Sequence, residues 1–265
     1  MEKSQKVQYE QLVPQEFRER IKECPIAYLP LGTLEWHGEH LPYGTDAYIG
    51  HDFCVKLAQR VGGIVLPMLF MGVDSASMSG SSNWYDKEYD YLYGMDHWTG
   101  EEEGDGGVKV RDPGQLEGSA YWITDDAFNL YIEAIFRQLK RAGFKVIVAH
   151  GHGPSGGFVA KRTQEWLDKY GLIVLNCWGS ELDAQGMGVQ VDHAAMNETS
   201  LTWALRPDLV QMYRLSSDLE DPHQAPVAVG GKDPRIHASE EKGKEIIAIN
   251  LVRMEKILKD ILEKI

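Results

Sequence analysis

Residues 26–46 read IAYLPLGTLEWHGEHLPYGTD, an apolar run that passes directly into a polar loop containing glycine and histidine. The run from Ile26 to Leu31 predicts a buried β-strand, because it is short, apolar and ended by Gly32. Residues 47–61 follow the loop and predict a helix. A strand, a loop and a helix in this order form the repeating unit of α/β proteins.

The same alternation continues to the end of the chain. Apolar residues at helical spacing predict a helix over 125–142, with Thr124 or Asp125 as N-cap and Gly143 as the stop. Further strands are predicted at 64–66, 145–149 and 172–175, and further helices at about 158–169, from near Ala195 and from about Ser239. This order predicts an α/β fold, a three-layer α/β/α sandwich with a mostly parallel sheet. Ligands bind at the carboxyl ends of the strands in such folds.

The chain has 265 residues, of which 43% are hydrophobic, and is predicted to form a single domain over 1–265. Residues of about 75–120 break the alternation, since they are rich in glycine, serine, tryptophan and tyrosine. A polar aromatic segment of this length is typical of a lid over a binding site or of an oligomer contact. Ser82 and Trp84, within this segment, are therefore candidate substrate-binding residues.

Charge and composition argue against several classes of partner. A formal net charge of −13 disfavours nucleic acid and anionic membrane surfaces, because either would repel the chain. The widely separated Cys24, Cys54 and Cys177 form neither a disulfide framework nor a thiolate zinc site. The first residues lack the apolar stretch of a signal peptide, and no run approaches the roughly 20 apolar residues that cross a bilayer. We therefore predict a cytoplasmic protein that acts on a small-molecule substrate.

The loop after the first strand carries the densest group of possible metal ligands. Residues 35–46 supply three carboxylates and two imidazoles, and zinc or manganese accepts both types of ligand. Glu35 and His37 are two residues apart, so in an extended segment both side chains project to the same side. Two intervening glycines allow the turn that brings Asp46 back towards them. The alternative is a solvated polar loop with hydrogen-bonded histidines.

Two further clusters follow later in the chain. Residues 150–157 read HGHGPSGG, directly after a predicted strand. They lack the Lys-Ser/Thr ending of a nucleotide-binding loop, so metal ligation by the histidines is the better interpretation. Residues 192–200 read DHAAMNETS, in which His193 and Glu198 could also be ligands. Alternatively, Glu198 is an ordinary acid in the first turn of a helix capped by Asn197 or Thr199.

Taken together, the three clusters resemble motifs of the creatininase (creatinine amidohydrolase) family. Gly32–Asp46 is similar to its G-S/T-x-E-x-H-G-x-H-L-P-x-G-T-D signature almost position for position. His150–Ser155 corresponds to N-G-H-G-G-N, with His150 in place of the first Asn, and His193–Ser200 corresponds to H-A-G-x-x-E-T-S. Residues 231–243 look like the family's C-terminal G-D-P…A-T-x-E-K-G stretch.

The resemblance implies a centre of two divalent metal ions, zinc or manganese, with Fe²⁺ as a further possibility. Glu35 and His152 would bind one ion and His37 the other. Asp46 would bridge the two. A water whose pKa is lowered by these cations would attack a carbonyl carbon of the substrate, which makes the chain an expected metal-dependent hydrolase.

The remaining ligand departs from creatininase itself. That enzyme has a Glu two residues after the histidine of the second motif, where this chain has Pro154. Relatives without this Glu complete the site with a later one, which points to Glu198 as metal ligand and candidate catalytic residue. His193 is the candidate catalytic proton shuttle, because imidazole titrates near neutral pH, and Asp192 could orient it.

The family implies several reactions and a homo-oligomer, with a hexamer plausible. C–N hydrolysis of an amide or cyclic amide is the leading expectation. The alternatives are C–C hydrolysis of a cyclic diketone derived from inositol, and a non-catalytic oligomeric binding protein with a vestigial metal site. His150 and Gly153 are candidate substrate-binding residues, although His150 could instead support the ligands. The other histidines have expected structural, surface or lid positions: His40, His51, His97, His223 and His237.

Overall fold

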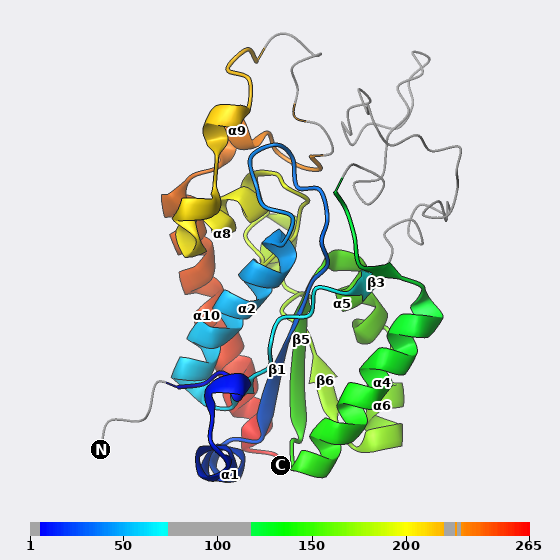
Figure 1. Ribbon diagram of the computed structural model, residues 1–265. Coiled ribbons are helices and arrows are strands. Elements are labelled where there is room, and N and C mark those ends of the chain that lie inside the picture. Colours follow the sequence, from blue (N-terminus) through cyan, green and yellow to red (C-terminus); the bar gives the residue numbers. More distant parts are fainter. Residues whose placement is uncertain (1–5, 74–117, 220–225, 227–228) are drawn as a thin grey trace.

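The computed structural model describes residues 6–73, 118–219, 226 and 229–265 (Figure 1). Its central sheet has the strand order β2-β1-β5-β6. All three pairings in this sheet are parallel, as the alternation of elements predicts. The strands are β1 (Ile26–Leu31), β2 (Ile64–Val65), β5 (Val146–Gly151) and β6 (Ile173–Leu175).

The two central strands end at the same level of the sheet. Ile26 of β1 is paired with Val146 of β5, and Leu31 with Gly151, so the loops after both strands leave from one edge. Gly151 has φ 147°, and a Cβ there would collide with the carbonyl oxygen of Leu31. This close approach brings His152 directly above β1, because His152 donates its backbone N–H to Leu31 at 3.0 Å.

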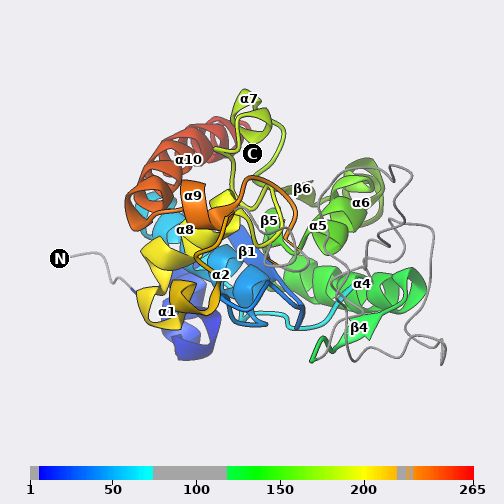
Figure 2. The same cartoon turned by 90° about the horizontal axis from the view of Figure 1, so that it is seen from above.

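Helices cover both faces of the sheet, which confirms the three-layer sandwich (Figures 1 and 2). Ile26 and Tyr28 face a core with α2 (Thr45–Val61), α8 (Met196–Leu205) and α10 (Glu240–Leu262). Ala27 and Leu29 alternate with them and face the opposite core. That second core is formed with α4 (Asp125–Ala142), α5 (Gly153–Ala160), α6 (Thr163–Tyr170) and part of α1 (Pro14–Glu23).

The predicted ends of the long helices are confirmed. The Thr124 side chain caps α4 by accepting from the Ala127 N–H at 3.3 Å, and Gly143 ends the helix in the left-handed region. Ser239 caps α10 in the same way, by accepting from Lys242 at 3.0 Å.

The single helix expected at about 158–169 is wrong, because the segment forms α5 and α6 with a break at residues 161–162. Gly153, Gly156 and Gly157 are helical, and Pro154 lies in the first turn, where its missing N–H costs no hydrogen bond. At the break, Arg162 leaves the helical region (φ −115°, ψ 18°) and donates from Nη1 to the Phe158 carbonyl oxygen at 3.0 Å.

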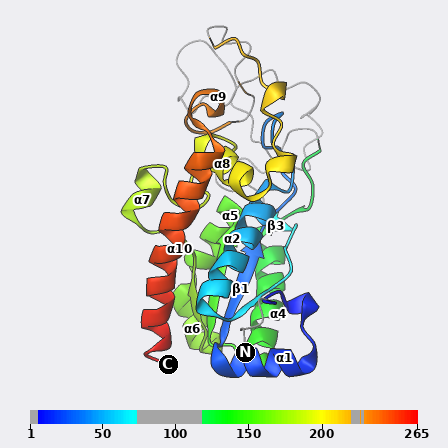
Figure 3. The same ribbon diagram turned by 90° about the vertical axis from the view of Figure 1, so that its left-hand side faces the viewer.

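Several short elements complete the described residues (Figure 3). Of these, β3 (Gly72–Val73) and β4 (Trp122–Ile123) form a separate parallel pair near the carboxyl edge of the sheet. None of the helices in the described ranges is long and apolar enough to cross a membrane. Ser82, Trp84 and nearly all of the segment at about 75–120 lie outside the described residues. The other short elements are η1 (Tyr9–Gln11), α7 (Glu181–Ala184), η4 (Pro207–Leu209), η5 (Met212–Arg214) and α9 (Pro234–His237).

Candidate metal centre

The fold gathers all five side chains that the sequence singles out as metal ligands. Glu35 and His37 lie in the loop after β1, and Asp46 lies in the first turn of α2. His152 follows β5 directly, and Glu198 lies in the first turn of α8. Each is at most 3% exposed, although they come from three stretches that are far apart in the sequence.

One half of the cluster consists of Glu35, Asp46 and His152. The Nδ1 atom of His152 lies 3.1 Å from Asp46 Oδ2 and 3.3 Å from Glu35 Oε2. The other ring nitrogen, Nε2, lies 3.0 Å from the Val73 carbonyl oxygen and must donate to it, since a carbonyl has no proton to give. A neutral His152 therefore turns the lone pair of Nδ1 towards two carboxylates, an arrangement that suits a cation between them.

The other half consists of His37, Asp46 and Glu198. His37 Nε2 lies 3.6 Å from Asp46 Oδ1 and 3.5 Å from Glu198 Oε2. This nitrogen is buried and has no hydrogen-bond partner among the residues that the structure describes. Its Nδ1 donates to the Glu35 carbonyl oxygen at 3.0 Å, which again leaves the lone pair of the inner nitrogen facing carboxylates.

The electrostatics of the cluster point to a bound cation. In the described part of the chain, the three carboxylates form ion pairs with histidines alone. Burial raises the pKa of Glu35 and, with the nearby Asp46 charge, that of Glu198. Burial disfavours the charged form of His37, but the carboxylates of Asp46 and Glu198 outweigh it and raise the pKa of His37 to about 10.

The donor set and its spacing fit two divalent ions that share Asp46. Ligand atoms about 2.0–2.2 Å from one ion lie roughly 3–3.6 Å from one another, which matches the separations in both halves. Each half contains one imidazole and two carboxylates, whose ligand atoms all lie within 4.8 Å of one another. Nitrogen and oxygen donors in this proportion suit zinc and manganese.

His193 lies beside this centre. Its ring centroid is 4.4 Å from that of His37, and it groups with Glu35 and His37 as a possible ligand. Its Nε2 donates to the Trp36 carbonyl oxygen at 2.8 Å, and burial lowers its pKa to about 3. A neutral His193 in this tautomer keeps the lone pair on Nδ1.

Asp192 does not orient His193 in the way the sequence suggests. Its carboxylate accepts from the backbone N–H groups of Asn197 at 2.7 Å and Glu198 at 3.0 Å. Asp192 therefore fixes the start of α8, and through it the position of Glu198.

His150 lies in β5 and is fully buried. Its Nε2 donates to the Val189 carbonyl oxygen at 3.1 Å, while Nδ1 accepts from the Cys177 N–H at 3.3 Å. Both nitrogens are thus occupied by backbone groups, and burial lowers the pKa of His150 to about 4. The structure disagrees with the expectation that this side chain contacts substrate, and favours a supporting role.

The remaining described histidines take three different positions. His40 is buried and donates from Nε2 to Thr199 Oγ1 at 2.8 Å, beside the start of α8. His51 is 7% exposed and pairs with Asp52, so its expected surface position is wrong. His237 is exposed in α9, as expected. His97 and His223 lie outside the described residues.

Sequence reasoning missed three side chains that support the cluster. Gln190 donates from Nε2 to Asp46 Oδ1 at 3.1 Å. The Trp122 ring meets the His152 ring at 88°, with centroids 5.4 Å apart. Ser155 Oγ accepts from the Val73 N–H at 3.0 Å and so holds the residue whose carbonyl binds His152. Only Ser155 lies in a motif that the sequence analysis singled out.

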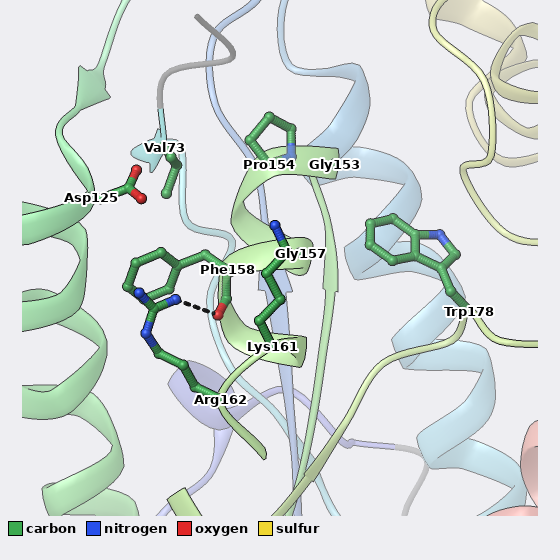
Figure 4. A pocket seen from close by; sticks show the side chains of 9 residues that line it. All are labelled: Val73, Asp125, Gly153, Pro154, Gly157, Phe158, Lys161, Arg162 and Trp178. Carbon is green, nitrogen blue, oxygen red and sulfur yellow. Dashed lines mark hydrogen bonds between the residues drawn. The ribbon is translucent and has the colours of Figure 1, made fainter. Parts of the chain in front are cut away.

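A pocket of about 700 Å³ lies over one face of α5 (Figure 4). It lies next to His152, because its lining includes Val73, whose carbonyl oxygen binds His152, and Gly153, the next residue in the chain. Gly153, one of the expected substrate contacts, forms part of its wall next to Pro154. The candidate metal ligands are not among its described lining residues, so the pocket adjoins the centre without containing it. The other lining residues are Val73, Asp125, Gly157, Phe158, Lys161, Arg162 and Trp178.

Comparison with known proteins identifies relatives of this chain. The family model of creatininase, described as creatinine amidohydrolase, matches residues 10–85 and 114–258. The creatinine amidohydrolase of Pseudomonas putida is 26% identical over 253 residues, covering 84% of this chain and 85% of that enzyme. The 3-dehydro-scyllo-inosose hydrolase of Thermotoga maritima is 23% identical over 154 residues, covering 58% of this chain and 38% of that enzyme.

Solved structures share the fold. A crystal structure of creatinine amidohydrolase superposes with a TM-score of 0.69 at 21% identity, covering 96% of this chain and 97% of the other. A structure described as "Creatininase Mn" gives a TM-score of 0.67 at 22% identity, covering 96% of this chain and 98% of the other. The family model covers most of the sequence and includes all five clustered side chains. The chain therefore belongs to the creatininase family.

Proposed function

We propose that the chain is a hydrolase that depends on two divalent metal ions and cleaves a C–N bond in a small amide or cyclic amide. The observation that carries the proposal is the arrangement of two buried imidazole lone pairs, on His37 and His152. Each faces two carboxylates, and Asp46 is common to both sets. Such a buried group of donors has no evident structural purpose without cations.

The residues divide into two ligand sets. Glu35, Asp46 and His152 would hold one ion, and His37, Asp46 and Glu198 the other. When bound there, the ions supply a Lewis acid for the substrate carbonyl and lower the pKa of water. Zinc and manganese are both supported, because relatives of known structure are described as "Creatininase Mn" and as a mutant of Zn–Zn type.

His193 would carry the proton to the leaving nitrogen. Its Nε2–H donates to the Trp36 carbonyl oxygen, which holds the ring in place, and Nδ1 is the ring nitrogen that would accept and release the proton. Its ring lies against that of His37, so a proton on Nδ1 is close to the ligand set. Glu198 would act mainly through its carboxylate as a ligand.

C–N hydrolysis is the favoured reaction because the similarity to the Pseudomonas creatinine amidohydrolase covers most of both chains. Gly153 remains a candidate substrate contact because it lines the pocket beside His152. Ser82 and Trp84 remain sequence-based candidates. A cytoplasmic homo-oligomer also remains our proposal, drawn from the family resemblance.

A second candidate is C–C hydrolysis of a cyclic diketone derived from inositol. It is supported by the similarity to the Thermotoga inosose hydrolase, which covers a smaller part of both chains than the Pseudomonas match. The same metal centre could polarise a ring ketone in place of an amide carbonyl.

The test is metal analysis of protein purified without chelator, followed by a screen of amides, lactams and 3-dehydro-scyllo-inosose. The wild type should bind zinc or manganese and open a lactam or amide, and Asp46→Asn should lose both properties. Turnover of the diketone alone would favour the second candidate. A chain that binds neither metal, even when zinc or manganese is added, would be a non-catalytic binding protein.

A further inference from the structure

The side chain of Gln190 forms hydrogen bonds with Asp46, the candidate bridging ligand. Its Nε2 donates to Asp46 Oδ1 at 3.1 Å and to the main-chain oxygen of Asp46 at 3.3 Å. Gln190 is 4% exposed and has φ 52°, in the left-handed region that non-glycine residues seldom adopt. A strained conformation of this kind persists only where the surroundings hold it.

Four side chains donate hydrogen bonds to backbone carbonyl oxygens of the loop at 186–191. Asn197 Nδ2 donates to two of its carbonyl oxygens, at 2.9 and 2.8 Å. Trp178 Nε1 donates to two more, at 2.9 and 3.0 Å. Asn250 of α10 and His150 of β5 each donate to one, at 2.7 and 3.1 Å. The accepting oxygens belong to Gly186, Met187, Gly188, Val189 and Gln190.

The contact with Gln190 determines how the Asp46 carboxylate is turned. Oδ2 faces His152 Nδ1 at 3.1 Å, while Oδ1 faces His37 Nε2 at 3.6 Å. The terminal torsion of an aspartate is broad, so a carboxylate without such a contact can rotate and direct both oxygens to one side. The Gln190 amide cannot be reversed, since its oxygen would then face the Asp46 carboxylate.

We propose that Gln190 is a positioning residue that fixes Asp46 as a bridge, with one carboxylate oxygen directed at each histidine and so at each metal position. This inference rests on the proposed two-metal function. Loss of a group that orients a metal ligand typically weakens metal binding by about 10–100-fold. Loss of the Gln190 amide should weaken the binding of the second ion more than that of the first.

Two substitutions separate the amide contact from the strained backbone. Gln190→Met keeps the length of the side chain and removes its donors. Gln190→Asn suits the left-handed backbone better but is one methylene too short to reach Asp46. Gln185→Met is the matched control, because Gln185 is an exposed residue near the same loop. Manganese titration by calorimetry gives the affinity, and electron paramagnetic resonance distinguishes a spin-coupled Mn²⁺ pair from isolated ions.

The wild type and Gln185→Met should bind a coupled pair. Gln190→Met and Gln190→Asn should require about 10–100-fold more manganese for the second ion and should show isolated Mn²⁺ at intermediate loading. Undiminished coupling and affinity in both Gln190 variants overturn the inference and leave the proposed function intact. If Gln190→Met does not fold, Gln190→Asn decides by the same criterion. A wild type that binds no manganese or zinc overturns both proposals.

Discussion

His37 Nε2 lies 3.5 Å from Glu198 Oε2 inside the protein, and that nitrogen makes no hydrogen bond within the described part of the chain. Glu198 reaches this position because its backbone N–H is held by Asp192 and its Oε2 accepts from the Ala194 N–H at 2.7 Å. Pro154, at the position where creatininase carries a Glu, lines the pocket over α5 and offers no side-chain ligand. The geometry thus brings a carboxylate from α8 to His37 in a chain whose second motif offers no carboxylate.

Replacing Glu198 by Gln should therefore empty one of the two metal positions. We expect metal content to fall from about two ions per chain to about one, with activity reduced at least about 10–100-fold. Elemental analysis after dialysis against limiting zinc measures the first effect. Glu39→Gln, an exposed change in the first motif, is the control. Full retention of both ions in Glu198→Gln would show that Glu198 is not a ligand.

His193→Gln should reduce turnover and leave both ions bound. A positioned general acid contributes about 10²–10⁴-fold to the rate, so the loss should fall in this range. A substrate with a better leaving group should recover part of the rate, because it needs less help from a proton. A loss of metal in parallel with the loss of activity would contradict this prediction and would make His193 a ligand.

The metal-free protein should lose stability as the pH rises. The folded pKa of His37 is raised to about 10 and that of His152 is raised as well, against about 6.5 in the unfolded chain. Their contribution is fully present below about pH 6.5 and is lost as the pH rises through the folded values. Thermal unfolding at pH 6.5, 8 and 9.5, with chelator and with zinc, checks this.

In that experiment the midpoint with chelator should fall by several degrees, since about 1 kcal/mol shifts it by roughly 2–4 °C at this size. The zinc-loaded midpoint should change less, because bound cations take the place of the protons. A metal-free His37→Gln variant should show a weaker dependence on pH. Equal slopes for wild type and variant would contradict the assignment.

His150→Phe tests the supporting role of this side chain. The change leaves the Cys177 N–H without its buried partner and leaves the Val189 carbonyl oxygen with Trp178 Nε1 alone, which should cost about 1–3 kcal/mol. Metal content should be unchanged in the folded variant. His237→Phe, at an exposed position, should alter neither property. Denaturant unfolding and elemental analysis of both variants suffice, and a change in substrate preference at full stability would restore a substrate contact.

The sequence predicts which of these side chains the fold brings together, because they lie in local motifs directly after strands or at the start of a helix. Once the parallel order of β1 and β5 is inferred, their loops must meet at one edge, and Glu35 and His152 follow. The N-terminal position of Glu198 in α8 follows from its motif in a similar way.

Supporting residues are harder to predict. Gln190 has no motif, and its contact with Asp46 depends on a loop held by side chains from three other parts of the fold. The sequence does not predict α5 as a separate helix, because the glycines of the second motif suggest a loop and are in fact helical. The local sequence does not predict the buried position of His51, whose partner Asp52 also binds Arg206 from a distant segment.

The candidate ligands come from segments spread between residues 35 and 198. Ions held by all of them would join the ends of long stretches of chain, in the manner of a removable cross-link. The lifetime of the folded chain would then depend on metal supply as well as on its core. Protein stripped of metal should be digested by protease faster than loaded protein, so metal shortage would limit the amount of enzyme as well as its turnover.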